Sequence, residues 1–133
     1  MESAAFTPGT AQGLALLLWS VDDHTPPQRL ATPFSHAAVA AAMELSVEIY
    51  FTARSVELLR PGVADRLLLS PQLSVLAAMR EAVAQGAVLR VCSEALAASG
   101  LDEQELIPEC QGRGGAVQFI ARTADLRWRS LVF

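Results

Sequence analysis

The chain has 133 residues, enough for one domain with one core, and 52% of them are hydrophobic while only 18% are charged. All ten basic residues are Arg, and the absence of Lys excludes Schiff-base chemistry and a Walker-type phosphate site. The net charge is −4 and the Arg residues are scattered, so we expect no nucleic-acid binding.

The apolar stretches of the sequence are short. The longest unbroken runs are residues 14–19 and 37–43, whereas a helix needs about 20 apolar residues to span a bilayer. Residues 1–13 contain no Lys or Arg, so the charged region of a secretory signal is missing there. We therefore expect a soluble, cytoplasmic protein without membrane contact, in which residues 1–13 form a poorly ordered N-terminal extension.

The first predicted elements are a strand, a loop and a helix. Residues 14–19 are continuously apolar, which is typical of a strand covered on both faces in a parallel sheet. Residues 20–31 are rich in Asp and Pro and predict a loop. Thr32 is placed to cap a helix with Pro33 at its first position, and the apolar spacing continues to Leu45.

The middle of the chain predicts a strand and two further helices. Residues 46–51 are rich in β-branched and aromatic side chains and predict the second strand. Thr52 is placed to cap a short helix that runs through Leu59. Ser70 and Pro71 repeat the pattern of a cap followed by proline, so we expect a helix from there to about Gln85.

Residues 87–92 predict the third strand, and a short helix is expected from Glu94 to Gly100. Asp102 and Glu105 have the spacing of a capping box at the start of another helical turn.

The C-terminal part predicts a loop at 108–115, a fourth strand at 116–120, a short helix at 121–126 and a fifth strand at 130–133. Strands that alternate with helices predict a parallel sheet with right-handed crossovers. The expected fold is one α/β domain over residues 1–133, a three-layer α/β/α sandwich with about five strands.

Cys92 is the leading candidate for a reactive group. It ends a predicted strand and directly precedes a helix, where unpaired amide groups and the helix dipole stabilise a thiolate. Arg90, on the same strand face, favours the anion, whereas Glu94 opposes it. The alternative is that Cys92 is a small buried hydrophobic residue, the commoner fate of a free cysteine.

Cys110 is a candidate resolving thiol, because the Gly-rich segment 111–115 beside it is flexible enough to carry it toward Cys92. Its spacing from Cys92 matches no metal or redox motif, and an incidental thiol is the alternative. In a reducing cytosol both cysteines should stay reduced.

Other polar residues also fall where predicted strands end. Thr52 and Arg54 follow the second strand, Ser93 follows Cys92, and these three with Arg90 are candidate supporting or ligand-binding residues. The acidic segment 22–24 follows the first strand and is expected to be solvated. With only two His residues and no ligand spacing, no metal site is expected, and no cofactor is expected either.

Three segments carry a family resemblance: Ser-Val-Glu-Ile-Tyr-Phe-Thr at 46–52, Ala-Gln-Gly-Ala-Val-Leu-Arg-Val-Cys-Ser at 84–93, and Arg-Ser-Leu-Val-Phe at 129–133. In order and spacing the chain from Leu14 onward resembles the DsrE/DsrF-like family of small sulfur-relay proteins. The resemblance implies an α/β/α fold, oligomers, and a cysteine that carries sulfane sulfur as a persulfide. By position, Cys92 corresponds to that cysteine.

The predicted function is therefore that of a sulfur carrier or sulfurtransferase-like protein acting through Cys92, a homo-oligomer that exchanges sulfur with donor and acceptor proteins. The alternative is a non-catalytic oligomeric module that binds a ligand or partner at the same sheet edge, with Cys92 in a structural role.

Overall fold

The structure is a computed structural model, and it describes residues 11–133. The predicted extension at 1–13 lies mostly outside the described residues. The amide of Gln12 donates to the carbonyl of Arg127 at 2.6 Å, and Gly13 begins the first strand.

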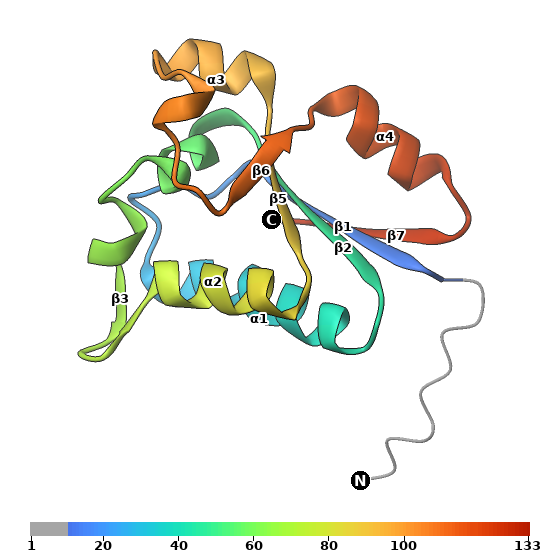
Figure 1. The fold of residues 1–133 in the computed structure, drawn as a ribbon, viewed down its shortest axis with the longest axis horizontal. Coiled ribbons are helices and arrows are strands. Elements are labelled where there is room, and N and C mark those ends of the chain that lie inside the picture. The colour runs from blue at the N-terminus through green and yellow to red at the C-terminus, as the bar shows by residue number, and fades with distance from the viewer. Residues whose placement is uncertain (1–10) are drawn as a thin grey trace, which may run out of the picture.

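A five-stranded sheet forms the centre of the molecule (Figure 1). Its spatial order is β6-β5-β2-β1-β7, and every neighbouring pair is parallel. The strands are β1 (Gly13–Leu18), β2 (Ser46–Phe51), β5 (Val88–Val91), β6 (Cys110–Arg113) and β7 (Trp128–Val132). The predicted parallel sheet of about five strands is confirmed.

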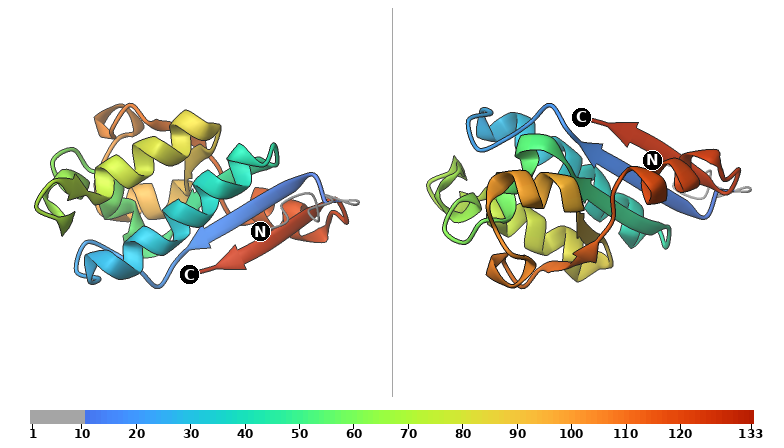
Figure 2. Two further views of the ribbon diagram at one scale, coloured as in Figure 1. Left: turned by 90° about the horizontal axis from the view of Figure 1, so that it is seen from below. Right: turned by 90° about the horizontal axis from the view of Figure 1, so that it is seen from above.

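Helices cover both faces of this sheet. Helices α1 (Pro27–Ala42) and α2 (Val75–Gln85) pack on one face, whereas α3 (Ser93–Ser99) and α4 (Ala116–Ala124) lie on the opposite side (Figure 2). The predicted three-layer α/β/α sandwich is confirmed. No helix among residues 11–133 is long and apolar enough to cross a bilayer.

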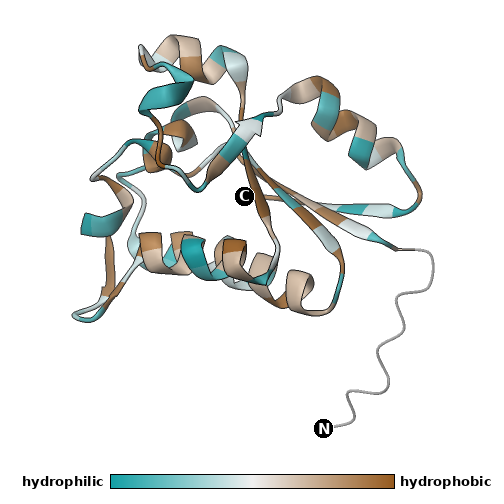
Figure 3. Cartoon of the chain, in the orientation of Figure 1, coloured by the Kyte–Doolittle hydropathy of each residue, from teal (hydrophilic) through white to brown (hydrophobic). Residues whose placement is uncertain are grey.

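The main core lies between the sheet and the α1–α2 layer. Hydrophobic residues follow the strands and line both of these helices (Figure 3). The rings of Phe34 in α1 and Phe51 in β2 stack with their centroids 6.2 Å apart, and Met79 of α2 is fully buried. The opposite face has a much smaller cluster of Ala15, Tyr50 and Phe119, so α4 is held by fewer apolar contacts.

Helix α1 begins six residues before the predicted start. Pro27 occupies the first turn in the way expected for Pro33, and the chain continues helically through Pro33. Leu30, Pro33 and Phe34 are all buried, so apolar packing of the added turns offsets the amide hydrogen that Pro33 lacks.

The predicted start of α2 was also wrong. Residues 70–73 contain the turn of a small hairpin formed by β3 (Leu68–Ser70) and β4 (Leu73–Ser74). The helix begins after it, and its cap is Ser74, whose hydroxyl accepts a hydrogen bond from the amide of Ala77 at 3.0 Å.

The C-terminal third differs most from the prediction. The predicted loop at 108–115 contains β6, and the predicted strand at 116–120 is the first part of α4, which continues through the helix expected from 121. Gly112 in β6 has φ +135 and the pairing with β5 shifts there, so a bulged, polar edge strand resembles a loop in sequence. A short apolar run such as 116–120 does not distinguish strand from helix.

The remaining predicted elements are present. The segment after Thr52 is a 3₁₀ helix, Ala53–Leu59, and two more 3₁₀ turns lie at Ala64–Arg66 and Glu103–Glu105. The last of these carries the predicted capping box between Asp102 and Glu105.

Candidate functional site

A cleft of about 490 Å³ opens at the carboxyl ends of the central strands, beside the start of α4. Ligand sites in open α/β sheets form at this edge because strand ends, loops and helix starts meet there. Leu17, Tyr50, Thr52, Cys92, Ser93, Glu94, Gly114, Gly115, Ala116, Val117, Phe119 and Ile120 line the cleft.

Cys92 is fixed in this cleft by its backbone. Its amide donates to the carbonyl of Phe51 at 2.9 Å, and its carbonyl accepts the amide of Leu96 at 2.9 Å as α3 begins. The side chain is a half-buried free thiol, and it also packs partly against the main core. The thiol is therefore positioned by strand and helix together, at an edge where a ligand can reach it.

Two of the four predicted supporting residues, Ser93 and Thr52, line the same cleft as Cys92. The guanidinium of Arg113 lies 3.4 Å from the Ser93 hydroxyl and also pairs with Glu103 at 2.7 Å. Two hydroxyl side chains therefore share the cleft with the thiol, although the rest of the lining is mainly apolar.

Arg90 is on the expected face of β5, but its Nε donates to a carboxylate oxygen of Glu48 at 3.2 Å. Within the described chain, the lining of the cleft includes the acidic Glu94 and no Arg or His. Arg90 is thus paired with Glu48, and neither residue belongs to the cleft lining.

Arg54 lies in another part of the sheet edge. It pairs with Asp22 at 3.4 Å and with Asp23 at 3.5 Å, and it is not part of the cleft lining. The backbone amide of His24 donates to Asp22 and holds the pKa of that carboxyl below its usual value. These residues form a solvated acidic loop closed by one Arg, and residues 11–133 contain no group of three His, Cys, Asp or Glu side chains suited to a metal ion.

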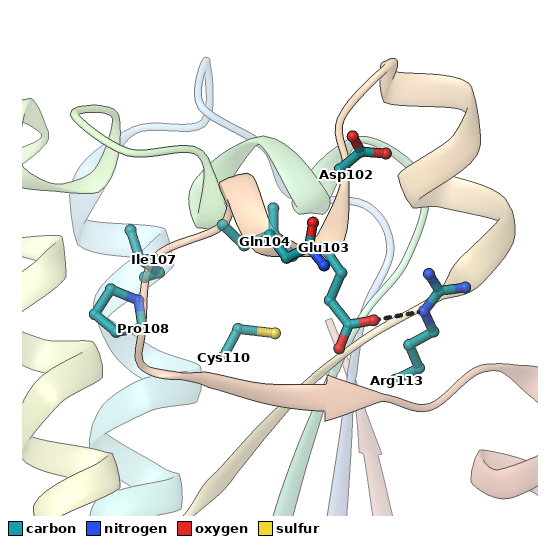
Figure 4. A pocket seen from close by; sticks show the side chains of 8 residues that line it. Asp102, Glu103, Gln104, Ile107, Pro108, Cys110 and Arg113 are labelled. Carbon is teal, nitrogen blue, oxygen red and sulfur yellow. Dashed lines mark hydrogen bonds and ion pairs between the residues drawn. The ribbon is translucent and has the colours of Figure 1, made fainter.

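Cys110 lines a different pocket, of about 660 Å³, whose walls include Glu103 and Arg113 (Figure 4). It is not on a mobile loop, because it begins β6 and is aligned with Leu89 of β5. Burial raises the pKa of its thiol, which disfavours the thiolate. The structure thus places the two cysteines in separate pockets.

The sequence reasoning missed Glu48, a carboxylate in the middle of the buried strand β2 with only 5% of its surface exposed. It accepts hydrogen bonds from the Tyr50 hydroxyl at 2.6 Å and from Nε of Arg122 at 2.8 Å. Arg90 and, at 3.4 Å, Gln118 donate to its other oxygen. Glu48 therefore joins two strands to α4.

Electrostatics keep the carboxylate of Glu48 ionised. Burial opposes the charge on Glu48, but the hydrogen bonds from Arg122 and Tyr50 and the charges of both Arg residues outweigh it, so its pKa lies below the ordinary value. Burial and the adjacent carboxylate raise the pKa of Tyr50. The sequence signal was available: a Glu inside an otherwise apolar strand needs a partner, and its i+2 residue is Tyr.

Two solved structures resemble this fold. A protein of unknown function from Methanobacterium thermoautotrophicum, MTH1491, superposes with a TM-score of 0.62 at 17% identity, over 92% of this chain and 99% of that one. The ychN protein from E. coli superposes with a TM-score of 0.69 at 13% identity, with the same coverage of both chains. No curated protein sequence matches the chain. The sequence model of the DsrE/DsrF-like family matches residues 17–128, and the chain belongs to that family.

Proposed function

We propose that the protein is a small cytoplasmic sulfur carrier, or sulfurtransferase-like protein, in which Cys92 takes up sulfane sulfur and passes it on. The observation that carries the proposal is the Cys92 thiol in a cleft at the carboxyl edge of the sheet. Membership of the DsrE/DsrF-like family supports a role related to sulfur relay.

The transfer needs two thiol exchange steps. The Cys92 thiolate attacks the outer sulfur of a donor persulfide, the donor S–S bond breaks, and the donor leaves as a thiolate. Cys92 then carries the persulfide. An acceptor thiolate attacks the terminal sulfur, the new S–S bond forms on the acceptor, and Cys92 leaves as the thiolate. No net oxidation occurs, so neither step needs a cofactor.

The residues around Cys92 differ in how far they can support these two exchange steps. Ser93 and Thr52 are the polar residues of the lining that can donate hydrogen bonds to a persulfide. Arg90 and Arg54 are engaged in ion pairs and act on the site only through their more distant charge. The carboxylate of Glu94 lines the cleft and disfavours the thiolate form of Cys92. We therefore expect sulfur exchange to require a donor that docks directly over the thiol.

The direct test is uptake of sulfur from a persulfide donor, followed by mass spectrometry of the intact protein and of its peptides. We expect one added sulfur atom on the Cys92 peptide, no addition in Cys92→Ser, and normal addition in Cys110→Ser. Equal results for the wild type and Cys92→Ser would contradict the proposal.

A non-catalytic binding module is the second candidate. It is favoured by the apolar lining and by the packing of the Cys92 side chain against the main core. The rate of alkylation at neutral pH distinguishes the two, because a reactive thiolate is modified faster than a model thiol. A rate no faster than that of the model thiol favours the binding module.

We also propose that the protein forms a homo-oligomer. Several large apolar side chains are exposed, among them Val117, Ile120 and Val132 on α4 and β7. Exposed apolar surface of this kind is often covered by a partner. Light scattering should give a mass that is a multiple of 14.2 kDa, and a monomer at micromolar concentration would refute the proposal.

A further inference from the structure

Helix α4 is weakly anchored by apolar contacts. Phe119 is its one buried side chain, and its ring meets Tyr50 edge to face with the centroids 5.5 Å apart. Helix α1, by contrast, buries six residues against the sheet. The position of α4 therefore depends on contacts other than hydrophobic packing.

Polar contacts supply that anchor. Gln118 and Arg122 lie four positions apart on one face of α4, and both reach the carboxylate of Glu48 in β2. The guanidinium of Arg122 also lies over the Trp128 ring, 4.3 Å from its centroid. Because the carboxylate is buried, these bonds are poorly screened by solvent and restrict where the helix can lie.

The same helix forms one wall of the Cys92 cleft. Val117 and Ile120 belong to the lining, and the backbone of Gly115 runs beside the Cys92 thiol. Gly114, which precedes α4, is tied to the sheet by a hydrogen bond from its amide to the carbonyl of Val91 at 3.0 Å. A shift of α4 about this connection would open or close the cleft.

We propose that Glu48 is a positioning residue that sets the width of the Cys92 cleft by holding α4 on the sheet through Arg122 and Gln118. Glu48 is absent from the cleft lining, so it acts through the helix. The inference concerns the site of the proposed function, but it requires only that Cys92 can be alkylated, not that it carries sulfur.

The test uses the full chain with Cys110→Ser, so that Cys92 is the only thiol. Glu48→Gln and Arg122→Met each remove one partner of the ion pair that holds α4 on the sheet. Arg80→Met is the matched control, since it breaks an ion pair of 2.7 Å with Glu109 that involves α2, on the other face of the sheet. Each variant is followed by hydrogen exchange of backbone amides and by the rate at which iodoacetamide modifies Cys92.

In Glu48→Gln and Arg122→Met we expect the α4 amides to lose about tenfold more protection than the α2 amides, because local opening of α4 adds to any loss of global stability. The alkylation rate of Cys92 should rise severalfold in both variants and stay at the wild-type value in Arg80→Met. Arg122→Lys keeps the charge but loses the forked contact, and it should lie between Arg122→Met and the wild type.

Unchanged α4 exchange together with unchanged alkylation in folded Glu48→Gln would overturn the inference. Equal loss of protection in α4 and α2 would do so as well, because it would make Glu48 a general stabiliser. If Glu48→Gln does not fold, the Arg122→Lys and Arg122→Met pair decides by the same criteria. If the exchange and alkylation rates change as expected but the wild type takes up no sulfur at Cys92, only the proposed function is refuted.

Discussion

The Cα of Gly115 approaches Cys92 so closely that a methyl group on it would lie 3.6 Å from the thiol sulfur, an ordinary van der Waals contact. The preceding glycine is more constrained. A methyl group on Gly114 would lie 2.7 Å from Cδ of Arg90 and 2.9 Å from Cε2 of Tyr50, which is too close without movement. Gly114 therefore has no room for a side chain, whereas Gly115 has room for a methyl group beside the Cys92 sulfur.

This difference gives the first prediction. Gly115→Ala should slow the alkylation of Cys92, because the added methyl group covers one side of the sulfur, and should cost about 1 kcal/mol or less of stability, because alanine is a poorer N-cap for α4 than glycine. Gly114→Ala should destabilise the protein by about 1–3 kcal/mol, since the side chains of Arg90 and Tyr50 must move. Urea unfolding and iodoacetamide kinetics measure the two effects, and faster alkylation in Gly115→Ala would contradict the first.

The second prediction concerns Phe119, the buried residue of α4. Phe119→Ala should lower the free energy of unfolding by about 3 kcal/mol, because the Tyr50 ring loses its partner and a cavity forms. Ala121→Ser on the same helix is the control: Ala121 is exposed and lies outside the cleft lining, so its effect should stay within about 0.5 kcal/mol. Equal losses of unfolding free energy in the two variants would contradict the assignment of Phe119 to the buried face of α4.

The elements with a strong local signal were predictable from the sequence. Strands β1 and β2 lie in the middle of the sheet, and their apolar runs identified them within a residue or so. Strand β6 lies at the edge, is polar and contains a bulge at Gly112, so neither apolar character nor alternation marked it. Helix α4 was missed because the short apolar run 116–120 alone does not distinguish a strand from a helix, and the helical period shows only when the residues through Ala124 are included.

The sequence predicted those site residues whose positions follow from the order of the parallel strands alone. Cys92, Ser93 and Thr52 follow adjacent parallel strands, so they meet at one edge. The pairing of Arg90 with Glu48 was not predictable, because it depends on the register of β2 against β5. Nor could the sequence place Gly114 and Gly115 at the site, since that required α4 to be recognised as a helix.

The third prediction concerns the end of α1. Glu44 has φ 71, in the left-handed region, and follows the C-cap Met43. The amides of Glu44 and Leu45 bond back to the carbonyls of Ala41 and Ala40, which is a Schellman motif. Glycine takes this conformation without strain, so Glu44→Gly should raise the free energy of unfolding by up to about 1 kcal/mol.

Glu44→Ala is the control for that measurement, because it removes the same side chain but keeps the Cβ atom. It should bring no such gain in thermal or urea unfolding. If Glu44→Ala stabilises the protein as much as Glu44→Gly, the relief comes from the lost carboxylate and not from the backbone.

The last prediction concerns pH and follows from the lowered pKa of Glu48. A carboxyl with a lower pKa in the folded than in the unfolded state stabilises the fold fully above the unfolded pKa, about 4.3, and loses that contribution as pH falls through the folded value. At pH 7, Glu48→Gln should therefore be less stable than the wild type by roughly 3 kcal/mol, since two Arg residues lose their anion. The difference between the two proteins should shrink steadily below about pH 4.

Comparing the two proteins at each pH isolates Glu48 from the other carboxyls with lowered pKa values, among them Glu57, Glu109 and Asp125, because these titrate in both. Urea unfolding from pH 3 to pH 7 measures the difference. A difference that stays constant over this range would mean that the carboxylate charge contributes nothing, and that Gln118, Arg122 and Tyr50 hold α4 equally well around a neutral side chain. Packing and neutral hydrogen bonds would then hold α4 on the sheet, and lowering the pH would not detach the helix.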